Sequence, residues 1–272
     1  MRQELTSSYH THNHYCDGEG RIEEVVEAAI ATNLTQIGIS SHAPLPFETE
    51  WNMPLGRLAD YIREVREVER RYRGQITVLL GAELDFIPDP RVSDFQRQEI
   101  FPLDFDYFVG SVHFLGKGYP PRSFDGTEEV FREILREDYG EDIAEMVADY
   151  YNRVRQMLSL PKVGIVGHLD LIKRWNADRS YFQGDEPWYV AAVEETLRAI
   201  AASGHMVELN TAGWRKGLGD PYPAPWILRR CREHAIPVTV NSDAHTPADV
   251  TWGFDRAQIC LAELGITPRP LT

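Results

Sequence analysis

The stretch that decides the fold reads Tyr9-His10-Thr11-His12-Asn13-His14-Tyr15-Cys16-Asp17-Gly18. If His10 and His12 lie at the end of a β-strand, alternation directs both side chains to the same side. Two imidazoles, followed five residues later by the carboxylate of Asp17, suit a divalent cation such as Zn, Fe or Mn. A polar N-terminal turn is the alternative interpretation, so the rest of the chain must decide.

Outward from this stretch, short β-rich runs alternate with amphipathic helical runs. We expect seven strands, at residues 8–12, 36–40, 76–82, 107–112, 164–167, 206–210 and 237–241. Apolar spacing predicts helices at 21–32, 55–72, 127–158 with a break near Gly140, 186–202, 224–234 and 248–264. Strict alternation of β and α predicts a parallel sheet.

Seven such units in 272 residues predict an α/β fold with a single domain over residues 1–272. The expected architecture is a TIM-like (β/α)7 barrel, one unit short of the common eight. A doubly wound open sheet is the alternative. No G-x-G-x-x-G turn follows any expected strand, so a dinucleotide-binding fold has no support.

The composition restricts the partners of the protein. A formal net charge of −14 argues against nucleic acid and anionic membranes, because phosphate binding relies on clustered Lys and Arg. A small phosphorylated substrate stays compatible, since bound metal ions add positive charge locally. The sequence contains neither a membrane-length apolar run nor an apolar leader, and its three scattered cysteines fit a reducing cytoplasm. The oligomeric state is left open, with a homodimer as one alternative.

Polar side chains gather where the expected strands end. Six of the nine histidines fall at these exits, and a barrel brings all exits to one rim. The exit residues are His10, His12, His42, Glu83, His113, His168, Asp243 and His245, with Asn210 and Arg215 at the sixth exit. With Asp17, the candidate ligands are too many for one tetrahedral ion, so we expect two or three divalent ions, Zn, Fe or Mn. His205 and His234 are expected to be structural.

The motifs at these exits resemble the polymerase-and-histidinol-phosphatase (PHP) superfamily. They are H-x-H, S-x-H-A-P-L, G-x-E-x-D, S-V-H, G-H-x-D-L and S-D-A-H, in this order. Within the superfamily, the segments 10–18, 41–46, 110–114 and 167–171 resemble monofunctional histidinol-phosphate phosphatases. The resemblance covers essentially the whole chain from Tyr9. It implies a distorted seven-stranded barrel with a three-metal site at the C-terminal ends of the strands.

The resemblance also implies a ligand for each ion. One ion would be held by His10, His12, Glu83 and Asp243, a second by Glu83, His113 and His168, and a third by Asp17, His42 and His245. Some relatives have a histidine near Asp17, so His14 is the alternative ligand. We favour Asp17, because the Asp-Gly turn can direct its carboxylate back into the site.

The activity implied by the resemblance is hydrolysis of L-histidinol phosphate in histidine biosynthesis. A metal-bridging hydroxide would attack phosphorus, and Asp243 or His245 would protonate the leaving alcohol. Arg174, Arg215 and Ser111 are expected to contact the phosphate, since guanidinium suits bidentate contact; Lys173 and Lys216 are less favoured. Candidates for recognising the imidazole, which the sequence does not rank, are Asp85, Tyr119, Trp175 and Trp214.

Three other functions are weighed against this one. The protein could hydrolyse another small phosphate ester or a nucleotide. It could be an amidohydrolase-like enzyme, although the usual bridging lysine has no counterpart at the earlier strand exits. A binding module that lost catalysis is disfavoured by the full set of metal-binding residues.

Overall fold

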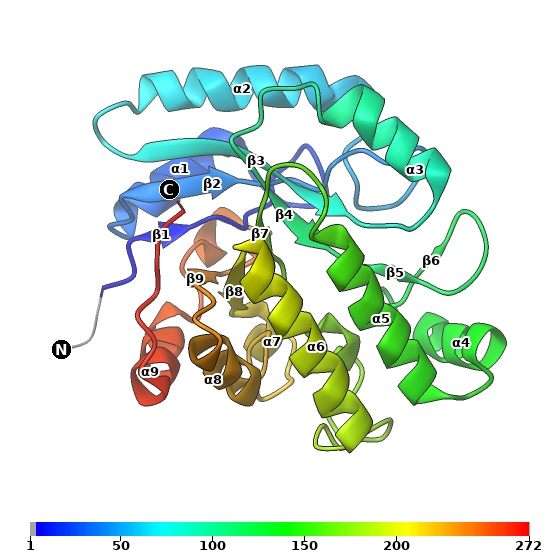
Figure 1. Cartoon of the computed structure of the whole chain (residues 1–272). Coiled ribbons are helices and arrows are strands. Elements are labelled where there is room, and N and C mark those ends of the chain that lie inside the picture. The colour runs from blue at the N-terminus through cyan, green and yellow to red at the C-terminus, as the bar shows by residue number, and fades with distance from the viewer. Residues whose placement is uncertain (1–3, 272) are drawn as a thin grey trace.

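Seven parallel strands form one sheet in the order β1-β2-β3-β4-β7-β8-β9. The computed structural model, which describes residues 4–271, places helices around this sheet (Figure 1). The strands are, in that order, Ser7–Ser8, Gln36–Ile39, Thr77–Asp85, Tyr107–Ser111, Val163–Val166, Met206–Asn210 and Val238–Asn241. Each expected strand is therefore present, and every pairing within the sheet is parallel.

The first and last strands approach each other and nearly close the sheet into a barrel. Thr11 and Ala244 form a parallel bridge beyond the ends of β1 and β9. The amide of His12 donates to the carbonyl of Ala244 at 2.7 Å, and the amide of Tyr9 donates to Oδ1 of Asn241 at 2.7 Å. The predicted distorted (β/α)7 barrel is confirmed, and the open doubly wound sheet is wrong.

The main helices follow the expected segments. They are α1 (Ile22–Ala31), α2 (Leu58–Arg71), α4 (Glu128–Tyr139), α5 (Ile143–Met157), α6 (Pro187–Ser203), α8 (Pro225–Glu233) and α9 (Phe254–Leu264). The expected break in the long helical segment has a local cause. Gly140 ends α4 in the left-handed conformation with φ 59°, and the carboxylate of Asp142 caps α5 by accepting from the amides of Ala144 and Glu145.

Several short elements lie outside the sequence prediction. They are α3 (Pro90–Phe95), a π-helical turn (Gln96–Ile100), the antiparallel pair β5 (Phe114–Leu115) and β6 (Arg122–Ser123), and α7 (Ala212–Arg215). Each follows the C-terminal end of a barrel strand, where the metal-binding residues are expected. Such short segments carry too little periodicity to be distinguished from loops.

Three predicted boundaries are wrong. The first strand ends at Ser8 rather than His12, because the amides of Tyr9 and Thr11 donate to side chains, those of Asn241 and Ser40, instead of a strand ladder. β3 continues through Asp85, paired with β4, so Glu83 lies inside a strand. The last helix begins at Phe254 rather than 248, because Gly253 with φ 76° separates it from a 3-10 turn at Pro247–Asp249.

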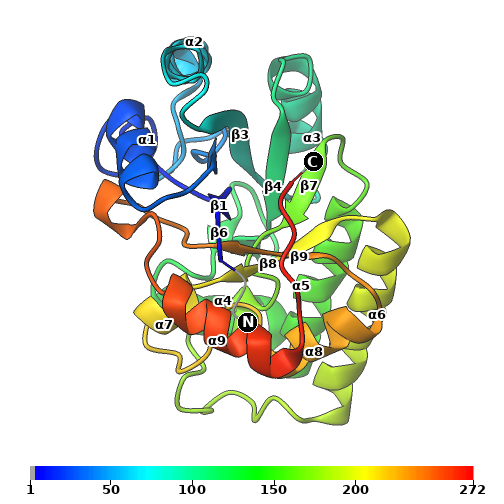
Figure 2. The ribbon, with the colours of Figure 1, turned by 90° about the vertical axis from the view of Figure 1, so that its left-hand side faces the viewer.

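The end of the barrel opposite the strand exits is filled by tyrosine side chains. The hydroxyl of Tyr107 donates to the carbonyl of Tyr9 inside the barrel. Gly38 and Gly81 make room for this ring, since a Cβ at either position would collide with Tyr107. The C-terminal segment runs back from α9 to this end (Figure 2), where the amide of Leu271 donates to the hydroxyl of Tyr9 at 3.0 Å.

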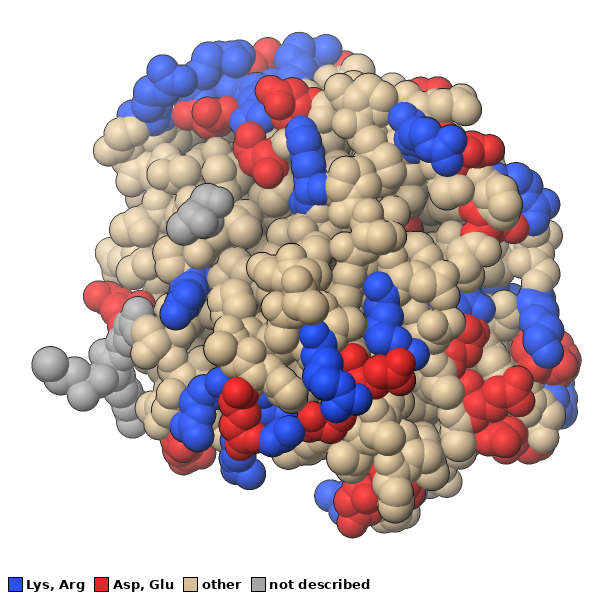
Figure 3. All heavy atoms as spheres, in the orientation of Figure 1, with Lys and Arg blue, Asp and Glu red and all other residues tan. Residues whose placement is uncertain are grey.

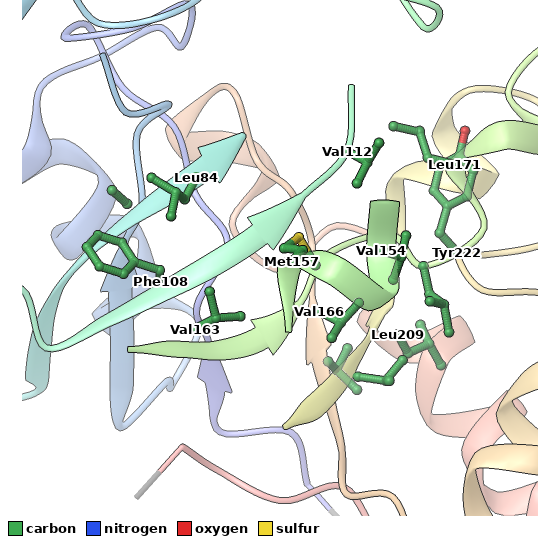
Figure 4. Close-up of a cluster of buried hydrophobic side chains, with 14 of the residues drawn as sticks. Leu84, Phe108, Val112, Val154, Met157, Val163, Val166, Leu171, Leu209 and Tyr222 are labelled. Atoms are coloured by element: carbon green, nitrogen blue, oxygen red, sulfur yellow. The ribbon is translucent and has the colours of Figure 1, made fainter. Parts of the chain in front are cut away.

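A second apolar layer lies between the sheet and the surrounding helices. Figure 4 shows part of it, in which Met157 and Val154 of α5 lie near Val163 and Val166 of β7. Burial of such side chains is worth about 25 cal/mol per Å² of apolar surface. This layer holds the strands in place, and with them the residues at the strand exits.

The surface carries mixed charge. On the face drawn in Figure 3, basic and acidic side chains are interspersed over α2 at the top and form no continuous basic stripe there. Within residues 4–271, no helix combines the length and the apolar character needed to cross a lipid bilayer.

Candidate metal centre

The carboxylate of Glu83, on β3, is the centre of a cluster of five imidazoles. It is only 1% exposed. Its Oε2 lies 3.1 Å from His10 Nε2, 3.1 Å from His42 Nδ1 and 3.5 Å from His12 Nε2, while Oε1 lies 3.0 Å from His168 Nε2 and 3.5 Å from His113 Nε2. These residues leave four different strands, so the barrel closure described above is what brings them together.

Two aspartates complete the cluster. Asp243, after β9, places Oδ1 3.2 Å from His12 Nε2 and 3.7 Å from His10 Nε2. Asp17, in the first loop, lies 3.4 Å from His245 Nε2 and 3.9 Å from His42 Nε2. All nine residues predicted as metal ligands therefore lie in one place.

Seven of the nine residues form three overlapping groups, in each of which the candidate ligand atoms lie within 4.8 Å of one another, while His168 and Asp243 lie beside these groups. The groups are His12, Asp17, His42 and His245; His10, His12 and Glu83; and His42, Glu83 and His113. In the predicted assignment only Glu83 is shared between two ions. In the structure His12 and His42 also belong to two groups each. The geometry thus offers three adjacent positions that share ligands, as multi-ion sites do.

Three ring nitrogens that lie near Glu83 make no hydrogen bond with it, which fits bound cations between them. Among the described residues, His10 Nε2, His12 Nε2 and His42 Nδ1 are buried without a hydrogen-bond partner. The Nε2 atoms of His113 and His168 lie 3.2 Å apart, too close for two protonated rings. Buried polar atoms are rarely left unsatisfied, and imidazole with carboxylate is a donor set that Zn, Fe and Mn accept.

Buried carboxylates orient two of the rings that are predicted to be metal ligands. Glu208 lies 3.1 Å from His10 Nδ1 and also accepts from the side chains of Asn210 and Asn241 at 2.8 and 2.7 Å. Asp85 lies 2.7 Å from His113 Nδ1. Such a contact fixes the tautomer in which Nε2 presents its lone pair to a metal.

Glu208 is absent from the sequence prediction. It lies in the middle of β8 (Met206–Asn210) and is fully buried. The sequence does indicate this role, because Glu208 is a charged residue within an apolar strand. A carboxylate buried in that way requires partners that hydrogen-bond to it.

The carboxylates make the field of the site strongly favourable to cations. Burial disfavours the charged form of His10, but Glu208, Glu83 and Asp243 raise its pKa well above the usual value. Burial likewise opposes protonation of His113, whose pKa is nevertheless raised to about 10 by Asp85 and Glu83. Such a site favours positive charge, for which protons and metal ions compete.

His42 shows the opposite behaviour. Burial is the main cause that lowers its pKa to about 4, helped by the neighbouring rings of His12 and His113. At neutral pH this imidazole is uncharged, which is the form that ligates a metal.

Two residues at the strand exits have unusual backbone conformations. Asp243 has φ 53° and His168 has φ 21°, both in the positive region that side chains other than glycine seldom adopt. Such conformations persist where the surroundings impose them and are common at functional sites. Here they follow directly after β9 and β7 and direct the two side chains toward Glu83 and the rings around it.

An open cavity of about 170 Å³ lies over the cluster. Besides metal-site residues, its lining includes Trp51, Ser123, Asp125, Gly126, Leu171 and Lys216. The sequence prediction ranked Lys216 behind two arginines and did not include Trp51 or Asp125. Trp51 and Asp125 lie on loops, and sequence periodicity does not predict where a loop lies relative to the barrel.

None of the predicted phosphate-binding residues is among those that line this cavity. Arg174 packs over the ring of Trp175, with its Cζ 4.3 Å from the ring centroid. Arg215 donates to the backbone carbonyl of Asp243 at 2.6 Å. Ser111 is buried and donates to Glu83 Oε1 at 2.6 Å, so it is placed to orient Glu83, and direct contact with a phosphate does not fit its position.

His14 lies apart from the cluster. Its Nδ1 is 3.2 Å from the carbonyl of Gly20, and it belongs to none of the three groups found among the described residues. Of the two alternatives left open by the sequence, Asp17 is the one within reach of the other ligands. His234 pairs with Glu194 at 3.1 Å near the end of α8, as expected of a structural histidine.

The four unranked candidates for imidazole recognition are engaged elsewhere. Asp85 contacts His113, and Trp175 Nε1 donates to the carbonyl of Phe124 at 2.9 Å. Tyr119 and Trp214 lie under the guanidinium groups of Arg91 and Arg256. None of the four is among the residues that line the cavity.

Together, the barrel and its cluster define an α/β barrel with a candidate metal centre, and comparison with known families makes this specific. The family model for the PHP domain matches residues 8–212. A protein of Deinococcus radiodurans named as a probable histidinol-phosphatase is 32% identical over 94% of this chain and 92% of its own length. The chain belongs to the PHP domain family.

A further relative agrees with this membership, and a solved structure agrees with the fold. The histidinol-phosphatase of Bacillus subtilis is 26% identical over 90% of this chain and 96% of its own length. The fold matches a structure of a histidinol phosphate phosphatase from Lactococcus lactis, complexed with zinc, L-histidinol and phosphate, with a TM-score of 0.71 at 20% identity, covering 97% of this chain and 96% of that one.

Proposed function

We propose that the protein is a metal-dependent phosphomonoesterase that hydrolyses L-histidinol phosphate to L-histidinol and phosphate, a step of histidine biosynthesis. The observation that carries this proposal is the convergence of five imidazoles on the buried carboxylate of Glu83, at the bottom of an open cavity. Relatives that match nearly the whole chain are named histidinol-phosphatases, which supports the substrate.

We further propose that the nine residues predicted from the sequence are the metal ligands. His10, His12, Asp17, His42, Glu83, His113, His168, Asp243 and His245 would hold two or three divalent ions, Zn, Fe or Mn. When bound, such ions lower the pKa of water and offset the negative charge that develops on the phosphoryl group. Glu83 contributes an oxygen to each half of the cluster, and Ser111 holds that carboxylate in position.

The proton for the leaving alcohol would come from Asp243 or His245. His245 is the better placed of the two, because its side chain is 35% exposed at the cavity while that of Asp243 is 8% exposed. Its Nδ1 lies 3.0 Å from the carbonyl of Asp243, so only Nε2 can carry the transferable proton. When His245 acts as the acid, the third ion would therefore be left to His12, Asp17 and His42. A general acid typically increases the rate of such a step by about 10²- to 10⁴-fold.

Arg215 and Arg174 have supporting roles in this proposal. Arg215 holds the Asp243 loop through its carbonyl and lies 3.5 Å from Asp249. Arg174 Nε is buried without a partner among the described residues, so it keeps one unused donor, although the residue does not line the cavity. Lys216 is the cationic side chain that lines the cavity itself, and we add it to the candidates for phosphate contact.

We also propose that the whole chain forms one domain, although the family model ends at residue 212. The barrel closes only when β9 (Val238–Asn241) lies beside β1, and Asp243 and His245 follow that strand. The partner that we propose is a small-molecule phosphate ester, whose two hydrolysis products, L-histidinol and phosphate, are bound in the structure from Lactococcus lactis. The cytoplasmic location and the oligomeric state stay predictions.

The proposal is tested by phosphate release from a panel of monoesters, with the metal content of the protein measured in parallel. L-Histidinol phosphate should be cleaved far faster than a nucleoside monophosphate or an aryl phosphate. Equal rates across the panel would leave a general phosphomonoesterase and contradict the specific substrate. Hydrolysis of an amide or amidine substrate instead of a phosphate ester would favour the amidohydrolase alternative.

A further inference from the structure

One carboxylate in the cavity is not used by the metal cluster. Asp17, Glu83 and Asp243 line the cavity as members of the cluster, and Asp125 is the fourth acidic residue of the lining. Its Oδ1 accepts from the hydroxyl of Ser123 at 2.9 Å. Asp125 belongs to none of the ion pairs found within residues 4–271, although His113 and Lys216 are near enough to act on its charge, so its second oxygen is available to a ligand.

Asp125 is held firmly in relation to the metal cluster. It follows β6 and the fully buried Phe124. The amide of Phe124 donates to the carbonyl of His113 at 3.1 Å, and the carbonyl of Phe124 accepts from Trp175 Nε1 at 2.9 Å. The backbone next to Asp125 is thus tied directly to a predicted metal ligand.

We infer that Asp125 determines substrate specificity by binding the ammonium group of the substrate while the phosphate lies at the metal cluster. This inference rests on the proposed function. In L-histidinol phosphate the ammonium group is on the carbon next to the CH₂ that carries the phosphoester oxygen, so both groups must fit in one small cavity. A carboxylate paired with an ammonium forms a charge-assisted hydrogen bond, roughly twice as strong as a neutral one.

Trp51 supplies an apolar surface for the rest of the substrate. It lines the same cavity and stacks on Phe114, with ring centroids 5.5 Å apart and an interplanar angle of 27°. Phe114 is itself buried and belongs to β5, the strand paired with β6. The β5–β6 pair thus positions both Asp125 and the support of Trp51, and an imidazole can stack on the indole.

Lys216 provides the competing explanation. It also lines the cavity, and a shift of its flexible side chain could pair it with Asp125. In that case Asp125 would only position Lys216, and its loss would affect every phosphate ester alike. The two explanations therefore differ in which substrates are affected.

The experiment compares Asp125→Asn with the wild type on two esters, L-histidinol phosphate and 3-(imidazol-4-yl)propyl phosphate, which lacks only the ammonium group. We expect kcat/KM for L-histidinol phosphate to fall about 10- to 100-fold, the range for a lost hydrogen bond to a charged group. Activity on the ammonium-free ester should stay unchanged. Glu129→Gln, an exposed acidic residue nearby on α4, is the matched control and should change neither.

A second measurement uses the products as inhibitors. Inhibition by L-histidinol should weaken about 10- to 100-fold in Asp125→Asn, while inhibition by inorganic phosphate and the metal content stay unchanged. Equal losses on both esters, or unchanged inhibition by L-histidinol, would overturn the assignment of Asp125. A wild type that does not prefer L-histidinol phosphate would instead overturn the proposed function itself, so the two failures are distinguishable.

Discussion

The carboxylate of Glu208 lies 3.1 Å from Nδ1 of His10, and both side chains are shielded completely from solvent. The amide of His168 also donates to Glu208, at 2.7 Å. One buried residue of β8 therefore connects the first and the fifth strand exits of the metal cluster. Its role is to hold the rings, since it does not line the cavity.

The change Glu208→Gln should weaken metal binding by about 10- to 100-fold, as is typical when a partner of a ligating histidine is lost. The amide can still accept from His10 but carries no charge to increase the basicity of its ring. Metal affinity is measured by competition with a chromogenic chelator, and activity should return when metal is added in excess. Unchanged affinity would contradict this role. Glu263→Gln, on the exposed face of α9, is the control.

The change Glu83→Gln should lower kcat/KM by about 1,000-fold or more. Ions that offset the charge on the phosphoryl group stabilise the transition state by several kcal/mol, and each 1.36 kcal/mol corresponds to about a tenfold change in rate. The number of ions bound per chain, from elemental analysis, should fall as well. Retention of both the full complement of ions and the activity would mean that Glu83 is not at the centre of the site.

Removing metal should destabilise the protein as well as inactivate it. Burial raises the pKa values of Glu83 and Asp243, but the surrounding imidazoles outweigh it and hold both well below normal. The two carboxylates therefore stay charged, and bound cations favour the folded state. At a metal concentration about 100 times the dissociation constant, the gain is about 2.7 kcal/mol. Thermal unfolding with chelator, and again after adding Zn or Mn, measures it. Identical melting temperatures would contradict cation binding by the cluster.

Much of this site is predictable because chemistry and periodicity agree in the sequence. His10, His12, His42, His113 and His168 were found as polar residues at the ends of apolar strands, which a barrel must bring together. Glu208 and Asp85 were not found as orienting residues, because their function depends on which ring faces them across the barrel. Asp125 and Trp51 lie on segments without periodicity, so only the three-dimensional packing of β5 and β6 places them.

The barrel packing gives a prediction that is independent of the metal. The change Gly81→Ala would force a methyl group against the ring of Tyr107. Overpacking of this kind typically costs about 1–3 kcal/mol, measured as the change in free energy of unfolding in urea. Gly56→Ala, where a Cβ would meet no atom within 4 Å, should leave the stability nearly unchanged. Equal effects of the two changes would contradict the packing described for Tyr107.

A surface carboxylate gives a prediction about pH. A hydrogen bond from Arg230 lowers the pKa of Glu194 to about 2. Burial opposes this shift, and His234 adds to it. The stabilisation is therefore fully present above the ordinary pKa near 4.5 and declines as the pH falls toward 2. Glu194→Gln should cost up to about 1 kcal/mol at pH 7 and progressively less below pH 4.5.

The control for this pH effect is the adjacent residue on α6. Glu195, whose side chain is 60% exposed and 3.6 Å from Arg155, should show a smaller difference between wild type and the Gln variant at every pH. Stability is measured by urea unfolding at pH 7, 5 and 4. A penalty for Glu194→Gln that does not decrease with falling pH would contradict the assigned pairing.

The central claim is that the cluster around Glu83 uses divalent metal to cleave L-histidinol phosphate. The most direct measurement is kcat/KM for phosphate release from L-histidinol phosphate and from p-nitrophenyl phosphate, by protein freed of metal and then reconstituted with Zn or Mn. We predict no significant activity without metal, and with metal a preference for L-histidinol phosphate of at least about 100-fold. Full activity in the metal-free protein, or equal kcat/KM for the two esters, would contradict the claim.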